Sequence, residues 1–205
     1  MTFSAKGTSE TFLETEKHGK IKCSGLTATG EIENEAKADN IVVKFTGCKA
    51  EKFGAGECKN KSAGEIETEK LAAKPEYVVG HKNPHEERLM DVFPQAGGKF
   101  AEFKCSSLAG TETLKVENPT AAENSLLGSI AASEVGVFLA SAKIDFDQTK
   151  GVQGPQEYEN EKSEKVKDFL MTSGSGPETF GPEPSGEEAE ETITYLPTGT
   201  KVKIT

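Results

Sequence analysis

The segment KIDFDQ (Lys143–Gln148) decides the fold class, because its residues alternate strictly between polar and apolar. Ile144 and Phe146 would occupy one face of a strand, and the charged residues around them would occupy the other. Such alternation is typical of a strand with one buried and one solvated face. Short apolar runs of this kind, separated by Gly, Pro, Asn and Asp, recur from one end of the chain to the other.

This spacing of strand and turn signals predicts an all-β fold, an antiparallel sandwich or a barrel-like sheet with long loops. A βαβ fold would need helical crossovers of about a dozen residues. One segment resists assignment: Val166, Phe169 and Leu170 lie at helical spacing behind Asn160, a candidate N-cap. A short helix near residues 160–170 and a strand both fit this segment.

The stretch Gly174–Glu191 combines Pro, Gly and Ser with a run of Glu, which is typical of a flexible acidic loop. The closing segment TITYLPTGTKVKIT is hairpin-like and is expected to return to the sheet. We therefore expect a single all-β domain over residues 1–205, with a flexible acidic loop at about 174–191.

The tetrapeptide GEIE occurs twice, as Gly30–Glu33 and as Gly64–Glu67. On a strand, the two glutamates of each copy share one face and the isoleucine takes the other. The simpler interpretation is an exposed pair of carboxylates above a buried isoleucine. The alternative brings the two copies together as a calcium site or as the carboxylates of a glycoside hydrolase. The residues concerned are Glu31, Glu33, Glu65 and Glu67.

The four cysteines, Cys23, Cys48, Cys58 and Cys105, form no CxxC pair, which argues against a structural zinc site. Their even number in a polar, β-patterned chain favours two disulfides. Of the three connectivities available to four cysteines, we expect Cys48 with Cys58 and Cys23 with Cys105. Disulfides persist outside the cytosol, so this prediction places the protein in the extracellular space or at the cell surface. Four free thiols are the alternative.

The composition excludes several classes of function. A formal net charge of -10, with Arg88 as the single arginine, disfavours binding to nucleic acid or to an anionic membrane. The chain has no apolar run long enough to span a membrane, and its first residues lack the pattern of a signal peptide. No GxSxG, P-loop or GxGxxG motif is present, which argues against catalysis.

Several segments, taken in order, resemble a group of secreted all-β proteins from high-GC Gram-positive bacteria to which no function is assigned. The segments are KIKCSG (20–25), TGEIEN (29–34), NIVVKFTGC (40–48), AGEIETEKL (63–71), FAEFKC (100–105) and TKVKIT (200–205). The block from FTGC to GEIET is the most specific. The resemblance implies export, in agreement with the disulfide interpretation, and implies no activity.

Together these features predict a secreted or cell-surface, disulfide-stabilised β module with a structural or binding role. One version is a subunit of an extracellular assembly, in which TFSAKGTSETFLET (2–15) adds a strand to a neighbour. Proteins or cell-wall polymers would be its partners, and self-association fits the same role. The alternative is a calcium-dependent extracellular hydrolase that uses the clustered carboxylates. Apart from this calcium, no cofactor is expected.

Overall fold

The alternation seen in the sequence is reproduced along the strands of a computed structural model. The structure describes residues 1–34, 36–51, 56–80, 88–96, 98–117, 125–131, 134–197 and 200–203. Along β15 (Ser141–Thr149), Ala142, Ile144 and Phe146 are buried, and Lys143 and Asp145 between them are exposed. The all-β prediction is confirmed. Within the described ranges, no helix has the length and apolarity needed to cross a membrane.

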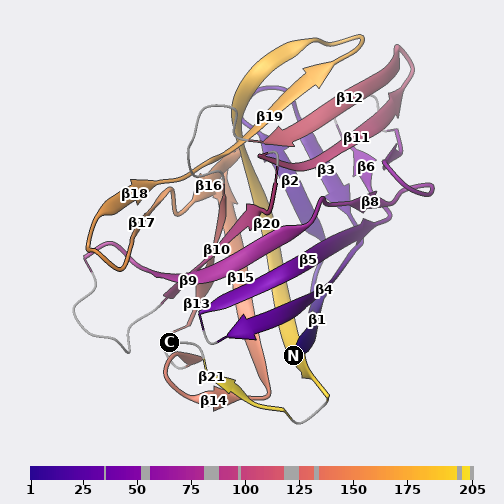
Figure 1. Cartoon of the computed structure of the whole chain (residues 1–205). Helices are drawn as coiled ribbons and strands as arrows, with labels where there is room; N and C mark the ends of the chain where they lie inside the picture. Colours follow the sequence, from indigo (N-terminus) through magenta and orange to yellow (C-terminus); the bar gives the residue numbers. More distant parts are fainter. Residues whose placement is uncertain are drawn as a thin grey trace.

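Eight strands pair side by side into a closed antiparallel barrel (Figure 1). In order around the barrel, they are β1 (Thr2–Gly7), β4 (Gly25–Asn34), β5 (Lys37–Thr46), β9 (Leu71–Tyr77), β10 (Arg88–Pro94), β13 (Leu126–Ile130), β15 and β20 (Phe180–Leu196), which pairs with β1 again. We call this set of strands the first ring.

A second ring of antiparallel pairings continues the first one, at the upper end in Figure 1. Its members are β2 (Thr11–Thr15), β3 (Lys20–Cys23), β6 (Lys49–Ala50), β7 (Cys58–Lys59), β11 (Lys99–Ser107), β12 (Gly110–Glu117), β19 (Leu170–Ser175) and again β20. A β-bridge between Lys49 and Glu57 connects β6 to the segment of β7 and closes this ring.

Six short strands lie outside the two rings or along their edges. They are β8 (Ile66–Glu67), β14 (Phe138–Leu139), β16 (Val152–Gly154), β17 (Glu157–Glu159), β18 (Lys165–Lys167) and β21 (Val202–Lys203). The strands β17 and β18 form a hairpin that projects from the barrel wall (Figure 1), and β14 pairs with β21 in a separate small sheet near the C-terminus.

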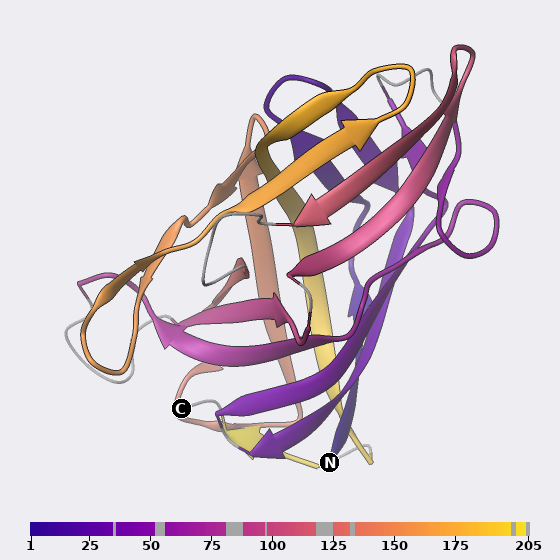
Figure 2. The ribbon, with the colours of Figure 1, turned by 45° about the horizontal axis from the view of Figure 1, so that its top comes forward.

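The 17-residue strand β20 belongs to both rings and runs the length of the molecule (Figure 2). Its first part, Phe180–Glu188, pairs with β19 and β2. Its second part, Ala189–Leu196, pairs with β15 and β1. One cluster of buried apolar side chains fills both rings, with Phe3 and Leu71 from the first and Phe103 and Leu114 from the second. The two rings therefore share a continuous core.

The prediction of an acidic loop at 174–191 is wrong, because residues 180–191 of this stretch belong to β20. Its Pro, Gly and Glu residues are poor strand formers locally. Pairing with neighbouring strands on both edges outweighs this local preference. Pro184, for example, cannot donate a hydrogen bond, yet its carbonyl accepts one from the N–H of Glu16 at 3.0 Å.

The helix considered near 160–170 is also wrong, because this segment contains a tight turn followed by β18. Asn160 caps the turn rather than a helix: its Oδ1 accepts hydrogen bonds from the N–H groups of Lys162 at 2.9 Å and Glu164 at 3.0 Å. Val166, in β18, packs against a small separate cluster around Tyr158, whereas Leu170 belongs to the barrel core. The apolar residues at helical spacing thus belong to two different hydrophobic clusters and not to one face of a helix.

Both edges of the N-terminal strands are paired within the chain. Every residue of β1 pairs with β20 on one edge, and most of them pair with β4 on the other. The strand β2 lies between β20 and β3 in the same way. Because both edges are occupied, strand addition by residues 2–15 would require the barrel to open, which argues against that version of the assembly hypothesis.

The close crossing of β16 over β20 generates a prediction about Gly186. A Cβ atom built at this position lies 2.5 Å from Cβ of Gln148 and 2.9 Å from the backbone nitrogen of Gln153. We expect Gly186→Ala to lower the free energy of unfolding by about 1–3 kcal/mol, since backbone atoms cannot yield easily. Denaturant unfolding would measure this loss.

Gly181→Ala is the matched control on the same strand, because among the described residues no atom beyond its chain neighbours lies within 4 Å of a Cβ atom there. It should change the stability by less than about 0.5 kcal/mol. Equal effects of the two substitutions would contradict the packing of β16 against β20.

Candidate ligand-binding cavity

A cavity of about 180 Å³ lies inside the barrel and extends through both rings. Its wall is almost entirely apolar and includes Phe3, Ile41 and Leu71 of the first ring with Ile21 and Phe103 of the second. An eight-stranded barrel is just wide enough for side chains to fill it or for one small ligand to bind. An apolar cavity of about 150 Å³ is known to accommodate benzene, so this one could hold a molecule of similar size.

Small inward-facing side chains create this space. Alanines occur at cavity-lining positions on five different strands of the first ring and on β11. The residues are Ala5, Ala28, Ala38, Ala73, Ala142 and Ala101. Ala28 lies between Thr27 and Thr29, which are exposed, so strand alternation directs its methyl group to the interior. The cavity is therefore a consequence of residue size at inward positions.

Two glutamates of β20, Glu187 and Glu191, also line the cavity. They share the inward face of the strand with Ala189, Ile193 and Tyr195. Glu191 is 8% exposed, and Glu187 is half-buried. Within the part of the chain that the structure describes, no hydrogen bond or ion pair satisfies either carboxyl group. Two carboxyl groups thus face an apolar space.

Burial has a large effect on the protonation of these two groups. It raises the pKa of Glu191 to about 7. Burial, together with the nearby charge of Glu191, raises the pKa of Glu187 to about 8. Desolvation disfavours the charged form of a carboxyl group, and a neighbouring negative charge adds to this effect. Near neutral pH, both protonation states of the pair are therefore accessible.

Sequence reasoning missed both glutamates because they were assigned to the acidic loop. A signal was nevertheless present in EEAEETITY, where every second residue from Glu187 onwards reads Glu, Ala, Glu, Ile, Tyr. This alternation is that of a strand with two carboxylates on its apolar face. Had the run been treated as a strand, the inward glutamates would have been candidates for a site.

The glutamates of the first GEIE motif are exposed, and those of the second motif are partly buried. Ile32 and Ile66 line the cavity, as the simpler interpretation predicts. Lys44 lies 3.2 Å from Glu65 and 3.9 Å from Glu67. In the first copy, Glu33 forms an ion pair with Lys37 at 3.0 Å, and Glu31 accepts a hydrogen bond from Asn40 at 3.2 Å. The carboxylates of both motifs are therefore engaged in ion pairs or hydrogen bonds with neighbouring lysine and asparagine side chains.

The two motifs do not converge on a common site. Glu31 pairs with Asp39 of β5, whereas Glu67 pairs with Lys44 of the same strand. Five residues of extended strand correspond to about 17 Å. Among the described residues, no group of three or more His, Cys, Asp or Glu side chains is arranged to hold a metal ion. The structure therefore does not bring Glu31 and Glu33 together with Glu65 and Glu67, as the alternative interpretation of a calcium site or a hydrolase requires.

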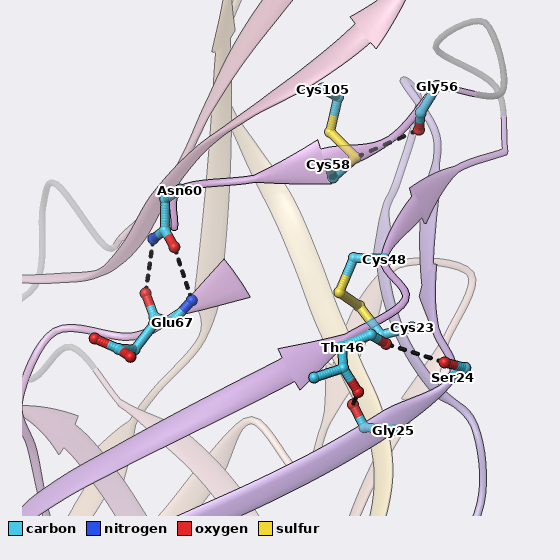
Figure 3. Close-up of a disulfide and its surroundings, with 10 residues drawn as sticks. All are labelled: Cys23, Ser24, Gly25, Thr46, Cys48, Gly56, Cys58, Asn60, Glu67 and Cys105. Atoms are coloured by element: carbon cyan, nitrogen blue, oxygen red, sulfur yellow. Dashed lines mark hydrogen bonds between the residues drawn. A yellow bond between two sulfur atoms is a disulfide. The ribbon is translucent and has the colours of Figure 1, made fainter. Parts of the chain in front are cut away.

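Two disulfides are present, as predicted, but their connectivity differs from the prediction. Cys23 is bonded to Cys48, and Cys58 is bonded to Cys105 (Figure 3). Cys58 and Cys105 are paired residues of the neighbouring strands β7 and β11. Cys23 is the last residue of β3, and Cys48 directly precedes β6, the strand that pairs with β3. The predicted pairing failed because the order of strands around the ring, rather than proximity in the sequence, determines which cysteines meet.

The disulfides lie where the strands of the second ring are shortest. The strands β6 and β7 contain two residues each, and they meet near the bridge between Lys49 and Glu57. One disulfide lies on each side of this junction. Nearby, the side chain of Asn60 forms two hydrogen bonds with the backbone of Glu67 (Figure 3). Covalent bonds and a side-chain bridge thus support the junction of two very short strands.

A buried polar cluster lies outside the barrel wall, beneath the hairpin of β17 and β18. Lys74 contacts Glu76 at 2.7 Å and Asp91 at 3.4 Å, and Ser125 donates hydrogen bonds to Asp168 from its hydroxyl and its N–H. Burial is the largest cause that raises the pKa of Asp91 to about 7. These groups bond mainly to one another, so we interpret the cluster as the attachment of the hairpin.

A second polar contact fastens the turn between β2 and β3 to β20. Nδ1 of His18 lies 2.7 Å from Glu183, and its ring stacks on Phe180 with centroids 4.1 Å apart. Burial opposes ionisation of Glu183, but hydrogen bonds from Thr15 and His18 prevail and lower its pKa. This contact supports the second ring where β20 begins.

Comparison of the chain with family models, curated proteins and solved structures gives no match.

The buried carboxyl groups predict an unusual dependence of stability on pH. Glu187, Glu191 and Asp91 have raised pKa values in the folded protein, so the folded state binds more protons than the unfolded state between about pH 5 and 8. The free energy of unfolding should therefore decrease as the pH rises through this range. A pKa shift like that of Glu191 corresponds to a loss of roughly 3 kcal/mol in the free energy of unfolding across this range.

Urea unfolding at pH 5, 7 and 9 would measure this dependence. Glu191→Gln should reduce the loss of stability between pH 5 and pH 7, because the amide stays neutral. Glu188→Gln removes a charge from an exposed residue of the same strand and should leave the dependence of stability on pH unchanged. A stability that increases from pH 5 to 9 would contradict the burial of these carboxyl groups.

Proposed function

We propose that the protein is an exported β-barrel module that binds a small apolar molecule in its interior. The observation that carries this proposal is the cavity of about 180 Å³ with its apolar wall. Ligand sites in proteins are typically concave, apolar and equipped with few polar groups. The cavity matches this description, with the two inward glutamates as its principal polar groups.

Export is the second part of the proposal, and the two disulfides support it. Disulfides persist in oxidising compartments and are rare in the cytosol. The resemblance to secreted proteins of high-GC Gram-positive bacteria points in the same direction. In this role the rigid, cross-linked wall would keep the cavity open in the extracellular environment, where reduction is slow.

Ethylbenzene, a neutral probe of suitable size, tests the binding function. At a concentration of about ten times its Kd, it should raise the Tm by about 3–6 °C. Ala28→Leu should abolish this rise, because the larger side chain fills the cavity. Differential scanning calorimetry with and without the probe would measure the shift.

Thr29→Leu is the matched control, since the adjacent side chain is exposed on the outer face of β4. It should retain the response to ethylbenzene. A failure of ethylbenzene to raise the Tm of the unmodified protein, or an equal rise in the Ala28→Leu variant, would contradict interior binding.

A further inference from the structure

The polar groups of the cavity restrict the chemistry of a ligand. Glu187 and Glu191 lie four residues apart on the same face of β20, so both point into the same interior. The hydroxyl of Thr11, on the adjacent strand β2, is buried at the same wall and has no hydrogen-bond partner among the described residues. An unsatisfied buried polar group costs stability unless a ligand or water satisfies it.

The positive side chains near the cavity do not neutralise these carboxyl groups. Lys37 and Lys203 also line the cavity, but Lys37 forms ion pairs with Glu33 and Asp39. Tyr195 is the remaining titratable group of the lining, and it is neutral at physiological pH. No ion pair joins Lys203 to Glu187 or Glu191 within the described chain.

The strands packed against β20 direct their charges away from the interior. Lys6 of β1 and Lys143 and Asp145 of β15 are exposed on the outer face. Glu14 of β2 accepts a hydrogen bond from Gln148 and lies 3.9 Å from Lys20 on the same outer side. The strand β19 has no charged residue. Among the described residues, this wall is therefore acidic, and no cation forms an ion pair with its two carboxyl groups.

We propose that the ligand is a small apolar amine whose ammonium group pairs with Glu191. This inference rests on the proposed function, because it assigns a chemical class to the occupant of the same cavity. The apolar part of the molecule would fill the space beside the alanines. Glu187 and the hydroxyl of Thr11 would provide further hydrogen-bonding groups. A ligand with a carboxylate would instead be repelled by ionised Glu191. A neutral ligand would leave the negative charge of Glu191 unpaired.

The pairing implies that amine affinity depends on pH. Burial raises the pKa of Glu191 to about 7, so this group becomes ionised between about pH 6 and 8. An alkyl amine, like lysine, stays protonated over this range. The affinity for an amine should therefore increase from pH 6 to pH 8, whereas the affinity for a neutral molecule of the same shape should stay constant or decrease.

Isothermal titration calorimetry of the full chain with three probes of similar shape would test the inference. The probes are phenylethylamine, ethylbenzene and phenylpropionate. At pH 8, phenylethylamine should bind about tenfold more tightly than ethylbenzene, as a charge-assisted hydrogen bond would provide. Phenylpropionate should bind most weakly.

Two variants separate the role of Glu191 from that of overall charge. Glu191→Gln should remove the advantage of phenylethylamine while ethylbenzene still binds, which would also show that the variant folds. Glu188→Gln, which removes the same charge from the outer face, should leave the affinity for phenylethylamine within about twofold of the original.

The outcomes distinguish the inference from the proposed function. If ethylbenzene binds and phenylethylamine binds no more tightly, the amine inference is overturned and the apolar site stands. Tighter binding of phenylpropionate would overturn it as well, in favour of an acidic ligand. If none of the three probes binds, the proposed function itself fails.

Discussion

The structure depends on one strand that belongs to two rings. β20 pairs with β19 and β2 in its first part and with β15 and β1 in its second part. Without the first part, the second ring would lose its continuity, and without the second part, the first ring would not close. This explains how a sequence with Pro182, Pro184 and Gly186 can form a strand: its hydrogen bonds are made with neighbours on both edges. Tertiary pairing here determines the secondary structure.

Parts of the fold could be predicted from local patterns, and parts could not. The alternation around Ile144 and the inward isoleucines of the two GEIE motifs follow from strand geometry alone, and the structure confirms them. The connectivity of the cysteines could not be predicted, since Cys23 meets Cys48 only through the order of strands in the second ring. Asn160 was misassigned because the same residue type caps helices and turns. Regular alternation therefore predicts individual strands, but it does not predict which strands become neighbours in the sheet.

The candidate site was the least predictable part of the protein. The conspicuous carboxylates, such as Glu65 and Glu67, lie outside the barrel beside lysines. Those that matter for the cavity, Glu187 and Glu191, were hidden in a stretch whose composition resembles a loop. A buried carboxyl group without a partner reduces the stability of a fold, and such local conflicts are expected chiefly at functional positions. The conflict on β20 is the physical basis of the proposed ligand site.

Amide hydrogen exchange along β20, followed by NMR, tests the central claim most directly. If β20 is one strand shared by both rings, its hydrogen-bonded amides should be protected from Ser185 to Tyr195, to a degree similar to those of β15. Rapid exchange up to Glu191, with protection only from Thr192 onwards, would indicate an acidic loop followed by a short strand. That result would contradict the second ring, the inward position of the two glutamates and the site derived from them.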